Sequence, residues 1–207
     1  MKVLFVIHQL DFADHMAVAY LSAIAKEQGH TTYFCCLKDS DLVLAVKQIR
    51  PDVVAYSVNI VGFTGILEAH KRAAKAHKFI SIMGGPQPTF FPESFPESGM
   101  DAYCVGEGEY AFRDFLNKVG NSEPFDNVDN LITLKKNNPV RPLISNLDEL
   151  PKADRDLILS SSYLKNVFKK TFYTTRGCPF ECAYCCNSYY RQLYSGKGPI
   201  VRRFSVE

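Results

Sequence analysis

Five short apolar runs in the first half of the chain alternate with segments of helical periodicity. The runs are Lys2–His8, Thr31–Leu37, Asp52–Val58, Phe79–Met83 and Ala102–Val105. They are apolar along most of their length, which is typical of strands buried on both faces of a parallel sheet. Strands that alternate with helices predict a sheet with helices packed on both of its faces. The sequence therefore predicts an α/β fold.

Helices are expected between these runs, at about Ala13–Gln28, Asp41–Arg50, Thr64–His77 and Glu107–Val119. The first has Asp11 or Asp14 near its start and Gly29 as its stop, and Pro51 ends the second. Five such strands favour a doubly wound, flavodoxin-like (Rossmann-like) sheet with the order 2-1-3-4-5, which binds ligands at the carboxyl ends of its strands. The loops at that edge are His8–Asp14, Ser57–Phe63, Gly84–Phe91 and Gly106–Glu109.

Glu107 and Glu109, in the last of these loops, allow two interpretations. Two carboxylates at this spacing are a candidate acid–base pair. The simpler interpretation is that they cap the following helix, because the amino end of a helix favours acidic residues.

Composition divides the chain into three parts. Residues 1–130 form the predicted sheet domain and end in polar, turn-rich residues. Residues 131–170 contain a predicted β-hairpin, with arms Asn130–Leu134 and Pro139–Ile144, followed by a linker from Ser145 to Lys170. Residues 171–207 begin with a β-favouring run that leads into a cysteine-rich loop.

Three cysteines in that loop, Cys178, Cys182 and Cys185, stand at C-x3-C-x2-C spacing. Thiolates gathered on a short loop suit iron–sulfur or zinc binding. Three thiolates hold only three corners of a four-iron cluster and leave one iron open to a small molecule, whereas an electron-transfer cluster normally uses a fourth cysteine. A structural zinc site completed by Cys186 or a histidine is the alternative. Neighbouring side chains on an extended loop point apart, so Cys186 is expected to be a bystander.

The stretch Tyr173–Cys186 resembles the signature of the radical S-adenosylmethionine (SAM) enzymes. In that family three cysteines, here Cys178, Cys182 and Cys185, hold a 4Fe-4S cluster, and SAM chelates the open iron. Reductive cleavage of SAM then gives methionine and a 5′-deoxyadenosyl radical. The resemblance also implies that Tyr184, which precedes the third cysteine, packs near the adenine of SAM.

Three further stretches, Met83–Glu93, Asp101–Glu109 and Leu147–Ile158, resemble the cobalamin-binding domains that precede many radical-SAM barrels and their linker into the barrel. The resemblance implies a corrinoid site lined by Ser57, Asn59, Gly84, Gly85 and Pro86. The nucleotide tail would enter between the first and the third or fourth strands. The two glycines lack Cβ atoms and let backbone approach a bulky ligand, although a tight turn is the alternative explanation.

The chain departs from the cobalamin-domain pattern after the first strand. Many such domains carry Asp-x-His-x-x-Gly there, with the histidine on cobalt, and Asp11–Ala17 does not match it. His8 and His15 lie on this loop, and each is either a residue that approaches cobalt or an unliganded loop histidine.

Taken together, the resemblance implies the N-terminal part of a cobalamin-dependent radical-SAM enzyme, with methyl transfer the commonest of several outcomes. Residues 171–207 would then be the truncated first β/α unit of a barrel that takes about 200 residues or more, and would be inactive alone. An unidentified small-molecule or peptide substrate and an electron donor such as flavodoxin or ferredoxin are the implied partners. The alternatives are a radical-SAM enzyme that has lost cobalamin, or a non-catalytic corrinoid or small-ligand binding module.

Composition also bears on the binding partners and the cellular location of the protein. The net charge is +2 and no basic run occurs, so nucleic acid is not suggested as a partner. No apolar stretch approaches the length of a membrane span. Four of the seven cysteines sit in one loop, which disfavours a disulfide scaffold and favours a reducing, cytoplasmic location.

Overall fold

The computed structural model describes residues 1–207 except 11–14, 161–162, 167–169 and 207. Its main sheet has the order β2-β1-β3-β4-β5-β6. The parallel strands are β1 (Lys2–Ile7), β2 (Thr31–Cys36), β3 (Val53–Ser57), β4 (Ile80–Gly84) and β5 (Ala102–Cys104). The predicted flavodoxin-like sheet and its strand order are confirmed.

The sixth strand, β6 (Leu131–Ile132), pairs antiparallel with β5 and corrects the predicted hairpin. Its buried Leu131 lies beside Cys104, so the first predicted arm completes the main sheet. The side chain of Asn130 donates to the Val105 carbonyl at 2.7 Å and ties the segment to β5. The second predicted arm, residues 139–144, contains no strand. The chain still turns back on itself here, because Ile132 bridges to Asn137, the Asn138 amide donates to the Leu131 carbonyl at 3.0 Å and the Asn130 amide donates to the Pro139 carbonyl at 2.9 Å.

Four helices cover the two faces of the sheet in pairs. Helices α1 (Met16–Glu27) and α6 (Glu109–Gly120) share one core cluster, and α2 (Leu42–Ile49) and α3 (Phe63–Ala76) share the other. Asp41 caps α2 by accepting from the Val43 amide at 2.7 Å, and Gly29 follows α1 with a φ of +77°. The predicted start of the first helix at Asp11 or Asp14 lies outside the described residues, and His15 occupies the N-cap position of α1.

The loop expected at Gly84–Phe91 is largely helical. Pro86 begins α4 (Pro86–Phe90), because proline has no N–H to lose at the first helical position. The chain continues through η1 (Pro92–Ser94) and α5 (Phe95–Ser98) into β5.

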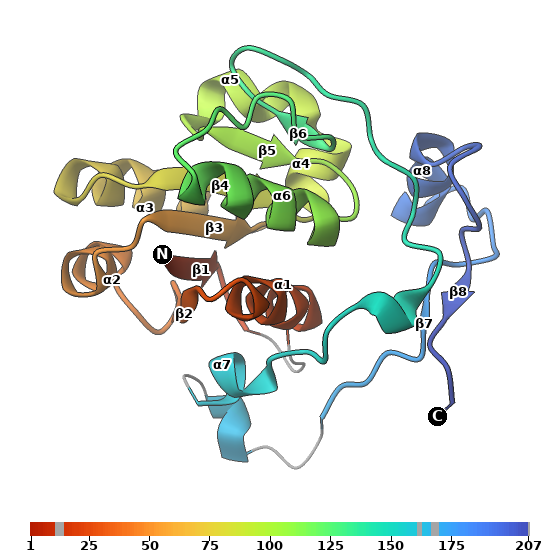
Figure 1. The fold of residues 1–207 in the computed structure, drawn as a ribbon, viewed down its shortest axis with the longest axis horizontal. Coiled ribbons are helices and arrows are strands. Elements are labelled where there is room, and N and C mark those ends of the chain that lie inside the picture. The colour runs from red at the N-terminus through yellow and green to blue at the C-terminus, as the bar shows by residue number, and fades with distance from the viewer. Residues whose placement is uncertain (11–14, 161–162, 167–169, 207) are drawn as a thin grey trace.

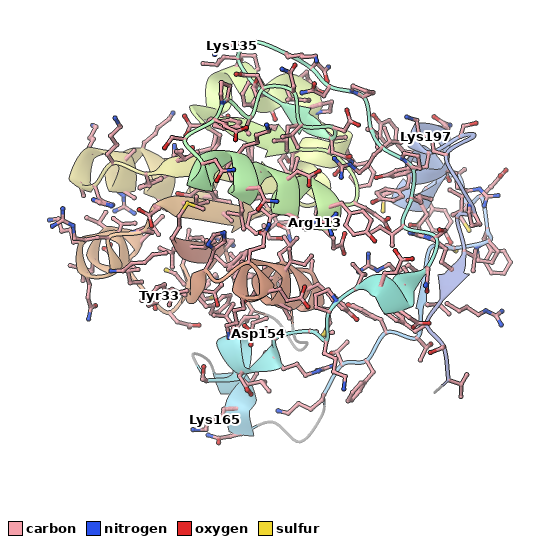
Figure 2. All side chains as sticks on the ribbon, in the orientation of Figure 1. Tyr33, Arg113, Lys135, Asp154, Lys165 and Lys197 are labelled. Atoms are coloured by element: carbon pink, nitrogen blue, oxygen red, sulfur yellow. The ribbon has the colours of Figure 1, made fainter. Side chains whose placement is uncertain are left out.

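The predicted linker packs against the sheet domain. It contains η2 (Leu147–Glu149), α7 (Arg155–Leu159) and η3 (Tyr163–Asn166). Asp154 accepts a hydrogen bond from the Ser22 hydroxyl at 2.5 Å and pairs with Lys26 of α1 at 2.7 Å. Figure 2 shows Asp154 where the linker meets this helix. The linker is therefore part of the folded unit.

The C-terminal segment lies beside the carboxyl edge of the sheet, toward which the arrowheads of β3 and β5 point (Figure 1). It contains β7 (Thr175–Arg176), α8 (Cys186–Leu193) and β8 (Arg202–Arg203), with β7 and β8 antiparallel. Among the described residues this segment forms no parallel strand pair, so the start of a barrel stays a prediction. No helix in the described part of the chain is long and apolar enough to cross a membrane.

Candidate functional site

A cavity of about 430 Å³ lies at the carboxyl edge of the sheet, on the face covered by α1 and α6. We call it the slot. Its volume is in the range of small-ligand sites in proteins. It is the edge at which the strand order predicts ligand binding.

The slot exists because the strands present small side chains there. Alternate residues of a strand face the same side, and on this side β3 presents Ala55 and Ser57 while β4 presents Ile82 and Gly84. Ala55 lies beside Ile82, and Ser57 lies beside Gly84. Cys104 lines the slot from β5, and burial raises the pKa of its thiol to about 12, which keeps it neutral. The small side chains of Ala55, Ser57 and Gly84 therefore leave space at the ends of β3 and β4.

The walls of the slot come from two helices and from the C-terminal segment. Met16, Tyr20 and Leu21 of α1 and Phe112 of α6 line one side. Further wall residues come from around the cysteine loop, namely Thr175, Arg176, Gly177, Cys178, Asn187, Tyr190, Ile200 and Arg202. The slot is thus shared between the sheet domain and the cysteine segment.

Two arginines meet two glutamates at the edge of the slot. Arg202 contacts Glu107 at 2.7 Å, and Arg176 contacts Glu109 at 2.6 Å and Glu107 at 3.5 Å. Although burial opposes it, the charges of Glu109 and then Glu107 raise the pKa of Arg176. The N-cap position of α6 is Gly108, and the Glu107 carboxylate binds Arg202 and Arg176. The helix-capping interpretation is therefore wrong for Glu107, whereas Glu109 does lie in the first turn of α6.

The predicted corrinoid residues fall into two groups. Ser57, Gly84 and Gly85 line the slot. Asn59 instead accepts a hydrogen bond from the Gly62 amide at 2.9 Å, and Pro86 begins α4; neither lines the slot.

The two glycines have different structural roles. Gly85 has a φ of +99°, and a Cβ there would lie 2.9 Å from the Val58 carbonyl oxygen. Its missing side chain therefore serves a tight backbone approach, as the turn interpretation holds. A Cβ at Gly84 would meet only the Cβ of Cys104, at 3.9 Å. Gly84 is thus the glycine that keeps the slot open.

Of the two candidate histidines, only His15 lies beside the slot. Its Nε2 is 3.4 Å from the Ser57 hydroxyl, and its buried Nδ1 has no hydrogen-bond partner among the described residues. Burial lowers the pKa of His15 and favours its neutral form. The ring of His8 packs against α3, and a Cβ on Gly65 would lie 3.2 Å from its Nε2.

The cysteine motif is partly exposed beside the slot. Cys178 lines the slot, and the Cys185 amide donates to the Cys182 carbonyl at 3.0 Å. All seven cysteines of the chain are free, which leaves the motif thiols available as soft ligands. In the described part of the chain no three His, Cys, Asp or Glu side chains are arranged around one metal position, so the cluster assignment stays a prediction. Tyr184, the predicted adenine contact, is 93% exposed.

Sequence reasoning missed several residues of this site. Ala55 lies two residues before the end of β3 and Cys104 is the last residue of β5, and these small residues near strand ends were a usable signal. Arg176 and Arg202 carried no comparable signal, because their partners lie far away along the chain.

A family model described as the B12 binding domain matches residues 9–116. An uncharacterized methyltransferase from Pyrococcus horikoshii is 28% identical over 185 residues, covering 84% of this chain and 40% of the relative. A hopanoid C-3 methylase from Methylococcus capsulatus is 26% identical over 157 residues, covering 70% of this chain and 30% of the methylase. The anaerobic magnesium-protoporphyrin IX monomethyl ester cyclase of Rubrivivax gelatinosus is 28% identical over 192 residues, covering 81% of this chain and 34% of the cyclase. The chain thus spans well under half the length of these relatives.

The fold is also similar to that of a solved structure, the radical S-adenosylmethionine methyltransferase TsrM from Kitasatospora setae with a tryptophan substrate and a SAM analogue bound. The TM-score is 0.73 at 15% identity, over 99% of this chain and 43% of that one. At this identity the likeness shows the fold alone.

Proposed function

The chain belongs to the B12-binding domain family, and from this premise we propose that it is the cobalamin-binding part of a cobalamin-dependent radical-SAM enzyme. The family membership confirms the predicted resemblance at the level of the cobalamin-binding domain. The relatives named as methyltransferase and methylase favour methyl transfer as the reaction of the whole protein.

The slot is the observation that carries this proposal. Its volume of about 430 Å³ suits the nucleotide tail of a corrinoid and is too small for the whole molecule. The macrocycle would then lie across the strand ends, beside Ser57 and Gly84. Ala55, Ile82 and Phe112 give the tail an apolar, water-poor surface. The residues present therefore fit a cobalamin bound with its tail inserted into the sheet domain.

The same proposal assigns Cys178, Cys182 and Cys185 to a 4Fe-4S cluster, with SAM at the open iron and Tyr184 near its adenine. When bound, the cluster and SAM supply a 5′-deoxyadenosyl radical, and cobalamin supplies a methyl group. Cys178 is both the first residue of the motif and a residue of the slot wall. This position favours a cluster close to the cobalamin.

The remaining residues of the site would bind and orient the cobalamin. The hydroxyl of Ser57 and the neutral imidazole of His15 are the polar groups beside the slot at the end of β3. His15 is therefore the candidate to approach cobalt, and His8 is not. A small-molecule or peptide substrate and an external electron donor remain part of the proposal.

Anaerobic reconstitution of the longer protein tests this function. With iron, sulfide, cobalamin, SAM and a strong reductant, it should release methionine and 5′-deoxyadenosine, which are measured by liquid chromatography. The Cys178→Ala variant should release neither product. Release of both without corrinoid absorbance in the protein would support a domain that has lost cobalamin. Corrinoid binding without SAM cleavage would support a non-catalytic binding module.

A further inference from the structure

The turn after β5 receives contacts from several separate segments of the chain. The Glu107 carboxylate accepts the Ile144 amide at 3.1 Å and an Arg202 N–H at 2.9 Å, and its other oxygen lies 2.7 Å from the second Arg202 nitrogen. The backbone N–H of Glu107 donates to the Tyr194 hydroxyl at 2.7 Å. Glu107 therefore connects the sheet domain to the residue just before the linker, to β8 and to the residue that follows α8.

The charges at this turn are buried and paired. The side chain of Arg202 is 3% exposed and that of Glu107 is 10% exposed. Arg176 adds a contact with Glu109 and also lies over the ring of Tyr20, 5.3 Å from its centre. A buried charge whose partner is removed is strongly unfavourable. These contacts therefore hold the C-terminal segment in one place.

The two arginines belong to a single antiparallel ribbon. Arg176 of β7 and Arg202 of β8 are directly paired residues, so neighbouring strands present both guanidinium groups to the same turn. Gly177 lets the chain after β7 lie close to the chain before β8, because a Cβ at Gly177 would lie 1.9 Å from the Ile200 carbonyl oxygen. Cys178 follows immediately, so the position of the ribbon sets the position of the first motif cysteine.

We propose that Glu107 and Glu109 are positioning residues, which act through Arg176 and Arg202 to hold the cysteine loop across the slot. The inference rests on the proposed function, because it assigns this turn the task of setting the separation between cluster and cobalamin. Neither glutamate touches the reacting atoms in this role. The ion pairs determine where Cys178 lies relative to the slot.

A first test needs no cofactor. In the cofactor-free chain, the alkylation rate of Cys178 by iodoacetamide is compared with that of the exposed Cys186 by peptide mass spectrometry. The wild type should label Cys178 several-fold more slowly, and Glu107→Gln should bring the ratio of rates close to one. Glu123→Gln is the matched control, because Glu123 pairs with Lys118 at 2.5 Å on the surface. An unchanged ratio in folded Glu107→Gln would overturn the proposal.

A second test uses the longer protein loaded with both cofactors. A reduced cluster close to cob(II)alamin speeds the electron-spin relaxation of cobalt, and this effect falls steeply with distance. Glu107→Gln should retain both cofactors at wild-type stoichiometry and lose most of the relaxation enhancement, and Glu107→Asp should restore part of it. Full enhancement in Glu107→Gln would contradict a positioning role.

Glu109→Gln provides a second variant if Glu107→Gln does not fold, because it removes the carboxylate 2.6 Å from Arg176 and leaves the contact between Glu107 and Arg202 in place. It should raise the labelling of Cys178 in the same direction, and no increase in the folded variant would overturn the proposal. A wild-type protein that binds neither cofactor would refute the proposed function, while the labelling ratio would still decide whether this turn positions the loop.

Discussion

The hydroxyl of Tyr194 accepts the backbone N–H of Glu107 at 2.7 Å, although the two residues lie 87 positions apart. Tyr194 is 1% exposed, and burial raises the pKa of its phenol to about 12. The hydroxyl can occupy this position because Gly106 has no side chain: a Cβ there would lie 2.0 Å from the hydroxyl oxygen. This contact connects the sheet domain to the segment that follows the cysteine motif.

Replacement of Gly106 by alanine should therefore destabilise the protein. The φ of +79° at Gly106 alone costs a residue with a Cβ about 1–2 kcal/mol, and displacement of Tyr194 adds to this. Gly108→Ala is the matched control, because the nearest atom to a Cβ there is the Cys104 sulfur at 3.5 Å. Urea denaturation measures both variants. Equal free energies of unfolding in the two variants would contradict the packing described here.

Buried histidines predict that stability falls on mild acidification. Burial lowers the pKa of His15 and of His70 below the ordinary 6.5. As the pH falls through 6.5, the unfolded chain takes up protons that the folded protein does not, so the free energy of unfolding decreases. His70 contacts the Tyr56 hydroxyl at 3.0 Å and the Gly99 carbonyl at 3.2 Å.

The measurement is urea denaturation at pH 7 and pH 5.5 in the wild type and in His70→Gln. The variant should lose less stability between the two pH values, because it has one buried histidine fewer. The same loss in both proteins would show that His70 does not contribute.

The cysteine assignment predicts that Cys185 is needed for the cluster and that its neighbour Cys186 is not. Cys185 has an extended backbone, and Cys186 begins α8 with an exposed side chain, so the two thiols are not expected to bind one iron. Anaerobic reconstitution of the longer protein should give about four irons, and alanine at Cys178, Cys182 or Cys185 should abolish the cluster. Iron analysis decides the assignment: loss of iron in Cys186→Ala with retention in Cys185→Ala would reverse it.

The parallel sheet was predictable because its signals are local. Apolar runs mark the strands, and Asp41 and Gly29 mark helix ends whatever the rest of the chain does. The β6 strand was not predictable in its correct place, because Leu131 pairs with a strand edge that only the folded sheet creates. The predicted loop Gly84–Phe91 contains two prolines, Pro86 and Pro88, and in the fold Pro86 begins a helix.

The site was only half predictable for the same reason. The strand order points to the carboxyl edge, and this located Ser57 and Gly84. The contact between Arg202 and Glu107 joins positions 95 apart and depends on how the C-terminal segment packs. Gly84 and Gly85 look equivalent in the sequence, and only the backbone angles separate the open position from the turn.

Gly84→Val tests most directly whether the slot receives the tail of cobalamin. Valine suits a strand, and at Gly84 its side chain would extend into the slot with only the Cβ of Cys104 nearby. Gly85→Val is a poor substitute, because its strained backbone and the clash with Val58 would disturb the fold itself.

The measurement is a hydroxocobalamin titration followed by absorbance, on wild-type protein and on Gly84→Val, with circular dichroism as the control for folding. We expect saturable binding by the wild type and at least tenfold weaker binding by the folded variant, equivalent to about 1.4 kcal/mol or more. Equal binding by the two proteins would contradict the location of the site, and no binding by the folded wild type would contradict the assignment of cobalamin.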